Sequence, residues 1–320
     1  MKKAVMFGEI LLRFTTNNGE RLSTCQNLSV CYGGSEANAA VSLCNYKMPA
    51  KFVTKLPQNP LGYAAKAQLD AHLVDTSEII FGGERIGTYY VDRFSSLRSQ
   101  KVFYDRKHSA IATAKAEEFN WDRILSDASW LHISGITPAL SEECAKSCID
   151  AVNCAAEKGL PISVDLNFRP LLWTGEAARK VMKKICEKAD YCIAFQDEPH
   201  DIFGFSDNVK TAAEQMMSEF NFKAIAITQS RDFKGIPFDF KALVYDGNEY
   251  YETREYEIYP TEKVGGGDAF SGGFIYKLLS GADFKSAADF AIAAACLKFS
   301  VKGDFNEVGI EEVKELIERK

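Results

Sequence analysis

Short apolar runs and helix-like segments alternate along most of the chain. Residues 3–10 ("KAVMFGEI"), 51–56 ("KFVTKL") and 130–136 ("WLHISGI") are apolar runs of the length typical of buried strands. Between them, residues 35–47 ("SEANAAVSLCNYK") and 142–158 repeat small and apolar side chains at helical spacing. The alternation predicts an α/β fold in which a largely parallel sheet is covered by helices.

Two stretches interrupt this alternation. Residues 11–33, with "LLRFTT" and "NLSVCY", and residues 85–106, with "RIGTYYVDRF" and "SQKVFYDR", are rich in β-branched and aromatic residues. Consecutive antiparallel strands inserted in an α/β chain predict a small separate sheet. Such a sheet could cover a site as a lid or pair with a second copy of itself, and two hairpins without a role remain an alternative. We find no domain boundary and expect residues 1–320 to form one domain.

Composition and charge narrow the class of protein. The chain is 46% hydrophobic and 26% charged, with a net charge of -6, so we expect no binding to nucleic acid. No apolar stretch approaches the length that spans a bilayer, so we expect no membrane insertion. Nine cysteines are scattered without a CxxC pair, as in proteins of a reducing compartment. We therefore predict a cytoplasmic protein.

Residues 262–274 ("EKVGGGDAFSGGF") carry the strongest sign of chemistry. Gly265, Gly266 and Gly267 lack side chains, and an apolar helix predicted over residues 268–279 would direct its free N–H groups toward an anion. A carboxylate beside a bound anion makes sense if Asp268 takes a proton from a hydroxyl that attacks the anion, as in phosphoryl transfer. A flexible hinge is the alternative. Neither a P-loop nor an early GxGxxG fingerprint is present.

Two segments resemble the signatures of the pfkB (ribokinase-like) carbohydrate kinases. "VGGGDAFSGGF" is similar to their C-terminal signature and "YGGSEANAAVSL" to their N-terminal one, in the right order across nearly the whole chain. The resemblance implies a three-layer α/β/α fold with a mostly parallel central sheet and a small β-sheet lid that often forms the dimer. It also implies transfer of the ATP γ-phosphate to a sugar hydroxyl, with Asp268 as the base and the amides of Gly265–Gly267 as the anion hole.

Within the family, the chain most resembles the 2-keto-3-deoxygluconate kinases, through "FYDRKHSA", "LHISGITPAL" and "DLNFRPLLW". A sugar acid carries a carboxylate that an arginine can hold in a fork, so Arg106 and Arg169 are expected to bind the substrate. Asp165 and Asn167 end a strand, where α/β sheets place their ligands. Glu9 stands where many sugar kinases of this family have aspartate. Kinases of a neutral ketose such as fructose or tagatose remain an alternative.

The remaining substrate contacts are expected near the N-terminal signature and the lid. Gly33 and Gly34 let a polyol approach the backbone, and Asn38, one helical turn later, can hydrogen-bond its hydroxyls. A tyrosine of the lid, Tyr89 or Tyr90, could cover the substrate, and we take Tyr90 as the candidate.

The resemblance also suggests the ATP and Mg²⁺ contacts. Thr228 belongs to "ITQSRDFKGI", which is similar to the family's nucleotide segment, and Gly265 and Gly267 face the phosphates. Glu198 matches the glutamate of an Asn-x-x-Glu motif that supports Mg²⁺ through water.

Three departures from the family pattern fall on this nucleotide side. The Asn of the Asn-x-x-Glu motif is Phe195, the first glycine of the nucleotide segment is missing, and the opening Asp of the C-terminal signature is Glu262. A sugar-acid-binding sensor that has lost catalysis is therefore a further alternative. Asp268 and its three glycines favour the kinase.

Overall fold

A ten-stranded sheet forms the centre of the protein. The computed structural model describes residues 2–95, 98–231 and 235–319. The strand order is β13-β12-β11-β10-β9-β8-β1-β4-β5, with β14 paired to β12. The strands are β1 (Lys3–Phe7), β4 (Ala50–Leu56), β5 (Ile79–Phe81), β8 (Ala128–Ser134), β9 (Ile162–Asp165), β10 (Tyr191–Phe195), β11 (Ala224–Gln229), β12 (Phe238–Tyr245), β13 (Tyr250–Glu252) and β14 (Tyr256–Ile258). The pairs from β5 to β11 are parallel, and the pairs of β12 with its neighbours are antiparallel.

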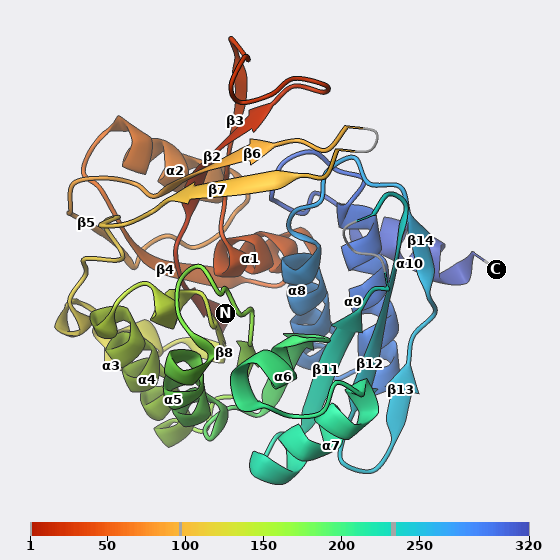
Figure 1. The fold of residues 1–320 in the computed structure, drawn as a ribbon. Coiled ribbons are helices and arrows are strands. Elements are labelled where there is room, and N and C mark those ends of the chain that lie inside the picture. Colours follow the sequence, from red (N-terminus) through yellow and green to blue (C-terminus); the bar gives the residue numbers. More distant parts are fainter. Residues whose placement is uncertain (1, 96–97, 232–234, 320) are drawn as a thin grey trace.

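Helices cover both faces of this sheet, as predicted (Figure 1). One face carries α1 (Ser35–Asn45), α2 (Pro60–Ala71), α8 (Gly266–Leu279) and α9 (Phe284–Lys298), with α10 (Ile310–Glu318) packed on α9. The other carries α3 (Trp121–Ile124), α4 (Glu142–Glu157), α5 (Gly175–Cys186), α6 (Glu198–Phe203) and α7 (Val209–Glu219). Two single turns, Ala116–Glu118 and Thr137–Ala139, complete the helical segments of the described residues.

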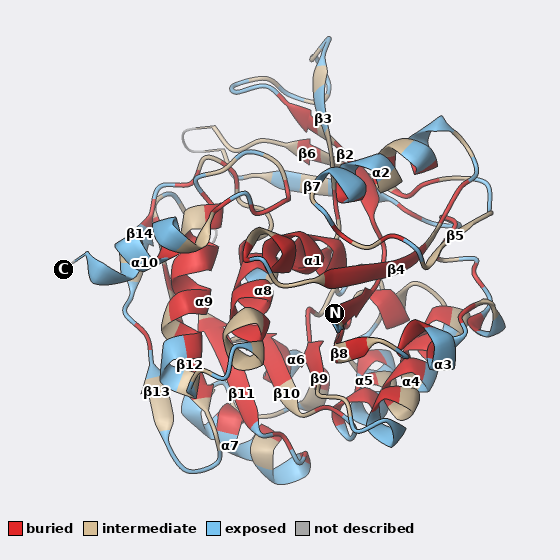
Figure 2. Ribbon diagram, turned by 180° about the vertical axis from the view of Figure 1, so that it is seen from behind, coloured by how far each residue is buried: buried red, intermediate tan, exposed pale blue. Residues whose placement is uncertain are grey.

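Strand β1 shows why the sequence favours this three-layer arrangement. Successive side chains of a strand point to opposite faces of the sheet. Ala4 and Met6 pack with α1 and α2, whereas Val5 and Phe7 pack with α4 and α5, and all four are completely buried. A strand buried on both faces has to be apolar throughout, which is the unbroken pattern seen in the sequence. Figure 2 shows these strands buried together with nearly all of α1, while exposed residues lie on outer helices such as α2 and α4.

The two strand-rich insertions form a separate four-stranded sheet, as predicted. Its order is β3-β2-β6-β7, with β2 (Leu11–Thr16), β3 (Leu28–Gly33), β6 (Thr88–Asp92) and β7 (Lys101–Asp105). This small sheet projects at the top of Figure 1, next to the N-terminal ends of α1 and α8. Residues 96 and 97, between β6 and β7, lie outside the described residues.

Local details follow the turn and helix chemistry of the sequence. Gly247, with φ of +91°, lies in the turn between β12 and β13, where the Asp-Gly pair predicts a hairpin. Helix α8 begins at Gly266, two residues before the predicted start, and Gly265 is its N-cap.

Within the described part of the chain, no helix is long and apolar enough to cross a membrane. All nine cysteines are described and are free thiols.

Candidate active site

One cavity of about 480 Å³ lies between the small sheet, the ends of the parallel strands and the glycine-rich loop, a size common for small-molecule sites. It collects residues from segments far apart in the sequence. Every predicted site residue except Tyr90 is among those that line it: Gly33, Gly34, Asn38, Arg106, Arg169, Glu198, Thr228, Gly265, Gly266, Gly267 and Asp268.

The glycine-rich loop turns sharply at Gly265 and enters α8. Gly265 has a φ of +73°, and a Cβ added there would lie 2.5 Å from Asp304 O, so both conformation and space require glycine. A Cβ added at Gly267 would meet nothing within 4 Å, so this position is open toward the cavity. The first N–H groups of a helix lack partners within it and form its positive end. The loop can therefore bind an anion.

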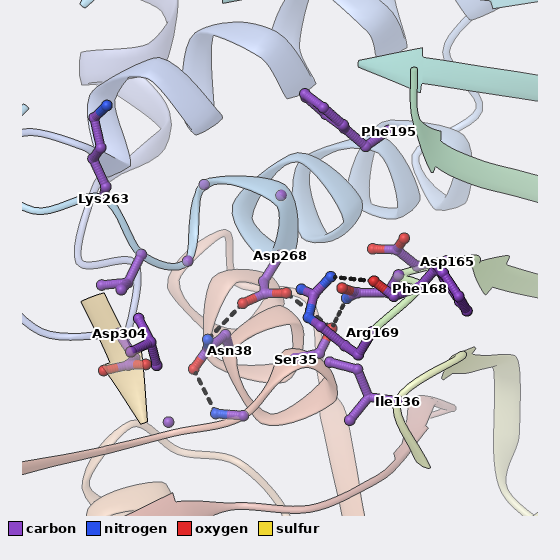
Figure 3. A pocket seen from close by; sticks show the side chains of 18 of the residues that line it. Ser35, Asn38, Ile136, Asp165, Phe168, Arg169, Phe195, Lys263, Asp268 and Asp304 are labelled. Atoms are coloured by element: carbon purple, nitrogen blue, oxygen red, sulfur yellow. Dashed lines mark hydrogen bonds between the residues drawn. The ribbon is translucent and has the colours of Figure 1, made fainter. Parts of the chain in front are cut away.

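Asp268 lies in the first turn of α8 and is held by two residues of α1. Asn38 donates from Nδ2 to Asp268 Oδ2 at 2.6 Å, and Ser35 donates from Oγ to Oδ1 at 2.9 Å (Figure 3). Asn167, which has an unusual φ of +39°, donates from Nδ2 to Ser35 Oγ at 2.9 Å. Burial raises the pKa of Asp268, and the hydrogen bonds from Asn38 and Ser35 oppose this shift. An oriented carboxylate of raised pKa is suited to accept a proton.

A guanidinium and two further carboxyl groups lie beside Asp268. Arg169 follows the end of β9, and its Nη1 donates to Phe168 O at 3.0 Å, which uses one of five guanidinium N–H groups. Burial raises the pKa of Asp165 well above its ordinary value; the charges of Glu198 and Asp268 raise it further, and Arg169 lowers it. The cavity thus combines a cation with a carboxyl cluster.

Glu198, at the start of α6, is positioned by the backbone. Its Oε1 accepts from Phe168 N and its Oε2 from Phe195 N, both at 2.8 Å. Burial raises the pKa of Glu198, whereas Arg169 and the amide hydrogen bonds lower it. A divalent cation nearby would offset the electrostatic repulsion between the Asp165 and Glu198 carboxylates. No group of three or more metal-ligating side chains occurs among the described residues, so such a cation would need water and phosphate ligands as well.

Arg106 lines the cavity, but its charge is already paired. Its Nε donates to Glu9 Oε2 at 2.8 Å, and its Nη2 donates to the same oxygen. Ser109 donates from its hydroxyl to Glu9 Oε1. Both charged side chains are nearly completely buried. Arg106 and Glu9 therefore form a neutral unit, which leaves Arg169 as the better candidate for holding a substrate carboxylate.

The small sheet places Tyr89, not Tyr90, at the cavity. Tyr89 lines it, stacks on Tyr104 and donates from its hydroxyl to Asp304. Tyr90 points to the opposite face of the sheet and stacks on Phe14. The choice of Tyr90 as the covering tyrosine is thus incompatible with the alternation of side chains along β6.

The nucleotide segment is only partly described. Thr228, at the end of β11, is buried at the cavity wall and donates from Oγ1 to Ala194 O at 3.2 Å. Phe195, at the position of the motif's asparagine, also lines the cavity. Residues 232–234, within the predicted nucleotide segment, lie outside the described residues.

Sequence reasoning missed Asp304, which is buried at the cavity next to both glycine signatures. It pairs with Arg13 at 3.0 Å, and side chains added at Gly33 or Gly265 would collide with it. No motif surrounds Asp304, and the only local hint is the glycine that precedes it. Ser35 was also missed, although it directly follows the Gly33-Gly34 pair.

Comparison with known proteins supplies independent information. The model of the "pfkB family carbohydrate kinase" matches residues 1–308. A 2-dehydro-3-deoxygalactonokinase of Haloferax volcanii is 31% identical over 313 residues, which cover 98% of this chain and 96% of that protein. The crystal structure of 2-dehydro-3-deoxygluconokinase from Thermotoga maritima superposes with a TM-score of 0.96 at 41% identity, covering 99% of this chain and 98% of the other.

A more distant structure has the same fold. An Escherichia coli protein described as a putative ribokinase II, solved in complex with ATP and Mg²⁺, superposes with a TM-score of 0.87 at 21% identity. The match covers 100% of both chains.

Proposed function

Because this chain belongs to the pfkB family of carbohydrate kinases and is a sugar kinase, a phosphotransferase with an alcohol acceptor, we propose that its acceptor is a sugar acid. We propose 2-keto-3-deoxygluconate (2-dehydro-3-deoxygluconate) as the preferred substrate, with its galactonate epimer as the nearest competitor. ATP is the proposed phosphoryl donor.

The position of Arg169 carries the proposal about the substrate. A carboxylate taken out of water is costly unless a cation meets it, and the planar guanidinium fits a carboxylate in two parallel hydrogen bonds. Arg169 lines the same cavity as Asp268 and keeps most of its N–H groups beyond its single bond to Phe168 O. The neutral Glu9–Arg106 pair can add hydrogen bonds but no net charge. The names of the Haloferax and Thermotoga relatives, which are kinases of two epimeric sugar acids, support the same substrate class.

The proposed reaction uses Asp268 as general base. The acceptor hydroxyl passes its proton to Asp268, its oxygen forms a bond to the γ-phosphorus, and the bond between that phosphorus and the β,γ-bridging oxygen breaks to release ADP. Asn38 and Ser35 hold both carboxylate oxygens, so the base is oriented before the sugar arrives. The free N–H groups at Gly265–Gly267 are the proposed hydrogen-bond donors to the transferred phosphoryl group.

The carboxyl groups of Asp165 and Glu198 fit a role in holding Mg²⁺. Glu198 accepts a backbone N–H at each oxygen, which suits contact through water better than direct ligation. When bound, Mg²⁺ would neutralise charge on the ATP phosphates. Thr228, together with Gly265 and Gly267, is the proposed contact surface for the nucleotide.

The exposed face of the small sheet supports a homodimer. Val30, Phe14, Tyr90 and Phe103 are neighbours in register and form one apolar row across all four strands. Val30 is 57% exposed and Phe103 51% exposed, and a contiguous apolar surface of this kind marks an interface. A second copy of the same sheet would cover the row by two-fold symmetry.

The nine free cysteines support a cytoplasmic location for the protein, because thiols stay reduced in that compartment.

Measuring ADP release with a panel of acceptors tests the proposed function. The panel contains 2-keto-3-deoxygluconate, 2-keto-3-deoxygalactonate, 5-keto-2-deoxygluconate, tagatose and fructose, each with ATP and Mg²⁺. We expect the highest kcat/KM with one of the two 2-keto-3-deoxy sugar acids. A neutral ketose as the best acceptor would contradict the proposed substrate class, and binding of the acids without ADP release would indicate a sensor.

A further inference from the structure

Lys298 is a completely buried charged residue that does not line the cavity. It is the last residue of α9, with an exposed fraction of 0%. A buried ammonium group is rare and costly unless hydrogen bonds and opposite charges compensate for the lost water. Its Nζ donates to Gly303 O at 2.8 Å and to Val301 O at 3.3 Å. The lysine thus fixes the turn that follows its own helix.

This turn is bonded to the segment that leads into the glycine-rich loop. Phe299 O accepts from Thr261 N at 2.7 Å and from Glu262 N at 3.2 Å. Gly303 N donates to Glu262 Oε2 at 3.0 Å. The turn therefore holds the two residues that precede the loop through both their backbone and a side chain.

The same turn also lies against the loop itself. A Cβ added at Gly265 would lie 3.2 Å from Lys298 Cε as well as 2.5 Å from Asp304 O, and a Cβ at Gly266 would collide with the Phe299 ring. The side-chain positions of the two glycines are thus filled by residues 298–304. Any shift of this turn has to move the backbone amides that follow Gly265.

The charges around Lys298 are balanced. Arg13, from β2 of the small sheet, pairs with Glu262 and with Asp304, and both carboxyl groups are buried. Two cations therefore face two anions. Burial lowers the pKa of Lys298, whereas the charges of Asp304, Glu262 and Asp268 raise it. The cluster as a whole is neutral, which compensates for the burial of the Lys298 ammonium group.

We propose that Lys298 is a positioning residue for phosphoryl transfer, which holds the 299–304 turn behind Gly265 and so fixes the backbone amides of the anion-binding loop. It touches neither substrate. Amides that are held in one orientation stabilise the negative charge that develops on the transferred group. The inference depends on the proposed role of Gly265–Gly267.

Lys298→Met tests this role, because methionine keeps much of the side-chain length and removes the charge. We expect kcat to fall roughly 10- to 100-fold, the range found for residues that orient the ligands of a metal site from behind. The KM for the sugar and the Kd for ATP, measured by calorimetry without sugar, should stay within about threefold. Lys302→Met is the matched control, since Lys302 is exposed in the same turn and should retain normal kinetics.

A second variant separates positioning from charge balance. Lys298→Met alone leaves the buried cluster with an excess negative charge, and Lys298→Met with Glu262→Gln restores neutrality. We expect the double variant to regain thermal stability and yet remain as slow as Lys298→Met, because the turn still lacks its ammonium. Glu262→Gln alone measures the contribution of that substitution.

Three results would overturn the inference. They are a normal kcat in Lys298→Met, recovery of kcat in the charge-balanced double variant, and failure of that double variant to fold, which would make Lys298 a residue of stability. All variants are assayed with whichever sugar the unmodified protein phosphorylates best. An error in the proposed sugar acid is thereby detected in the acceptor panel and does not affect the comparison of variants.

Discussion

Asn38 donates a hydrogen bond to Asp268 at 2.6 Å, although 230 positions separate the two residues in the sequence. Ser35, also at the start of α1, binds the other carboxylate oxygen. The N-terminal glycine signature and the C-terminal one are thus joined at a single carboxylate. A base whose two oxygens are both held can accept a proton only from a narrow direction.

Asp268→Asn should therefore abolish most of the turnover without unfolding the protein. The new amide can still accept from Asn38 and can donate to Ser35, whose hydroxyl also accepts. Without the base, kcat should fall by about 10² to 10⁴, the usual scale of general-base catalysis. Steady-state kinetics and a thermal melt check this, and a folded variant with near-normal kcat would remove Asp268 from its role.

The sequence predicted the fold and most of the cavity because the responsible signals are local. The βα alternation, the glycine-rich helix starts and the strand ends each depend on a few neighbouring residues. Parallel strands then bring their carboxyl ends to one edge, which explains why Asp165, Glu198 and Thr228 meet.

Other features depend on contacts that no local pattern records. Tyr89 and Tyr90 have the same strand propensity, so the sequence does not distinguish them. The register of the small sheet decides which of the two side chains faces the cavity. Whether Arg106 carries an available charge depends on Glu9, which lies 97 positions away. Asp304 and Lys298 follow no motif, and their roles arise from packing against Gly265.

The buried Glu9–Arg106 pair has a consequence for mutagenesis. Arg106→Leu should lower the free energy of unfolding by about 3–5 kcal/mol, because it leaves the Glu9 carboxylate buried without a partner. Adding Glu9→Gln should recover most of the loss. Urea unfolding of both variants measures this. A loss below about 1 kcal/mol in Arg106→Leu would show that the pair is not coupled to folding.

Glu36 should make stability fall as the pH rises. Its Oε1 accepts from Ser134 N, Ser134 Oγ and Thr137 Oγ1, yet burial raises its pKa to about 7 from an ordinary value of 4.5. The folded state thus binds the proton more tightly than the unfolded state does. The stabilisation is complete below pH 4.5 and is lost as the pH rises through 7.

Glu36→Gln removes this titration. Relative to the unmodified protein, the variant should gain stability between pH 4.5 and pH 8, by roughly 3 kcal/mol in total. His132, whose buried ring has a pKa lowered to about 4, titrates in both proteins and cancels from the difference. Chemical unfolding at several pH values gives the curve, and a constant difference would contradict the assignment.

Phe103→Glu should convert the proposed homodimer to a monomer, because it places a charge in the exposed apolar row of the small sheet. Leu171→Glu is the control, since Leu171 is 84% exposed and lies outside the small sheet. Light scattering at micromolar concentration distinguishes the two states. A monomeric unmodified protein would contradict the dimer itself.

The central claim is that Arg169 selects a sugar acid, and its most direct test is the ratio of kcat/KM for 2-keto-3-deoxygluconate to that for fructose. Arg169→Ala should lower kcat/KM for the acid by a factor that corresponds to a loss of about 2–5 kcal/mol in transition-state binding, the cost of truncating one partner of a buried charge pair. Arg169→Lys keeps the positive charge but loses the two parallel hydrogen bonds of the guanidinium, so its kcat/KM for the acid should lie between those of the unmodified protein and Arg169→Ala. The loss of the Arg169 charge also raises the pKa of Asp268, but this affects both sugars and cancels in the ratio. We predict a ratio well above one in the unmodified protein that collapses toward one in Arg169→Ala; an unchanged ratio in that variant would contradict the account.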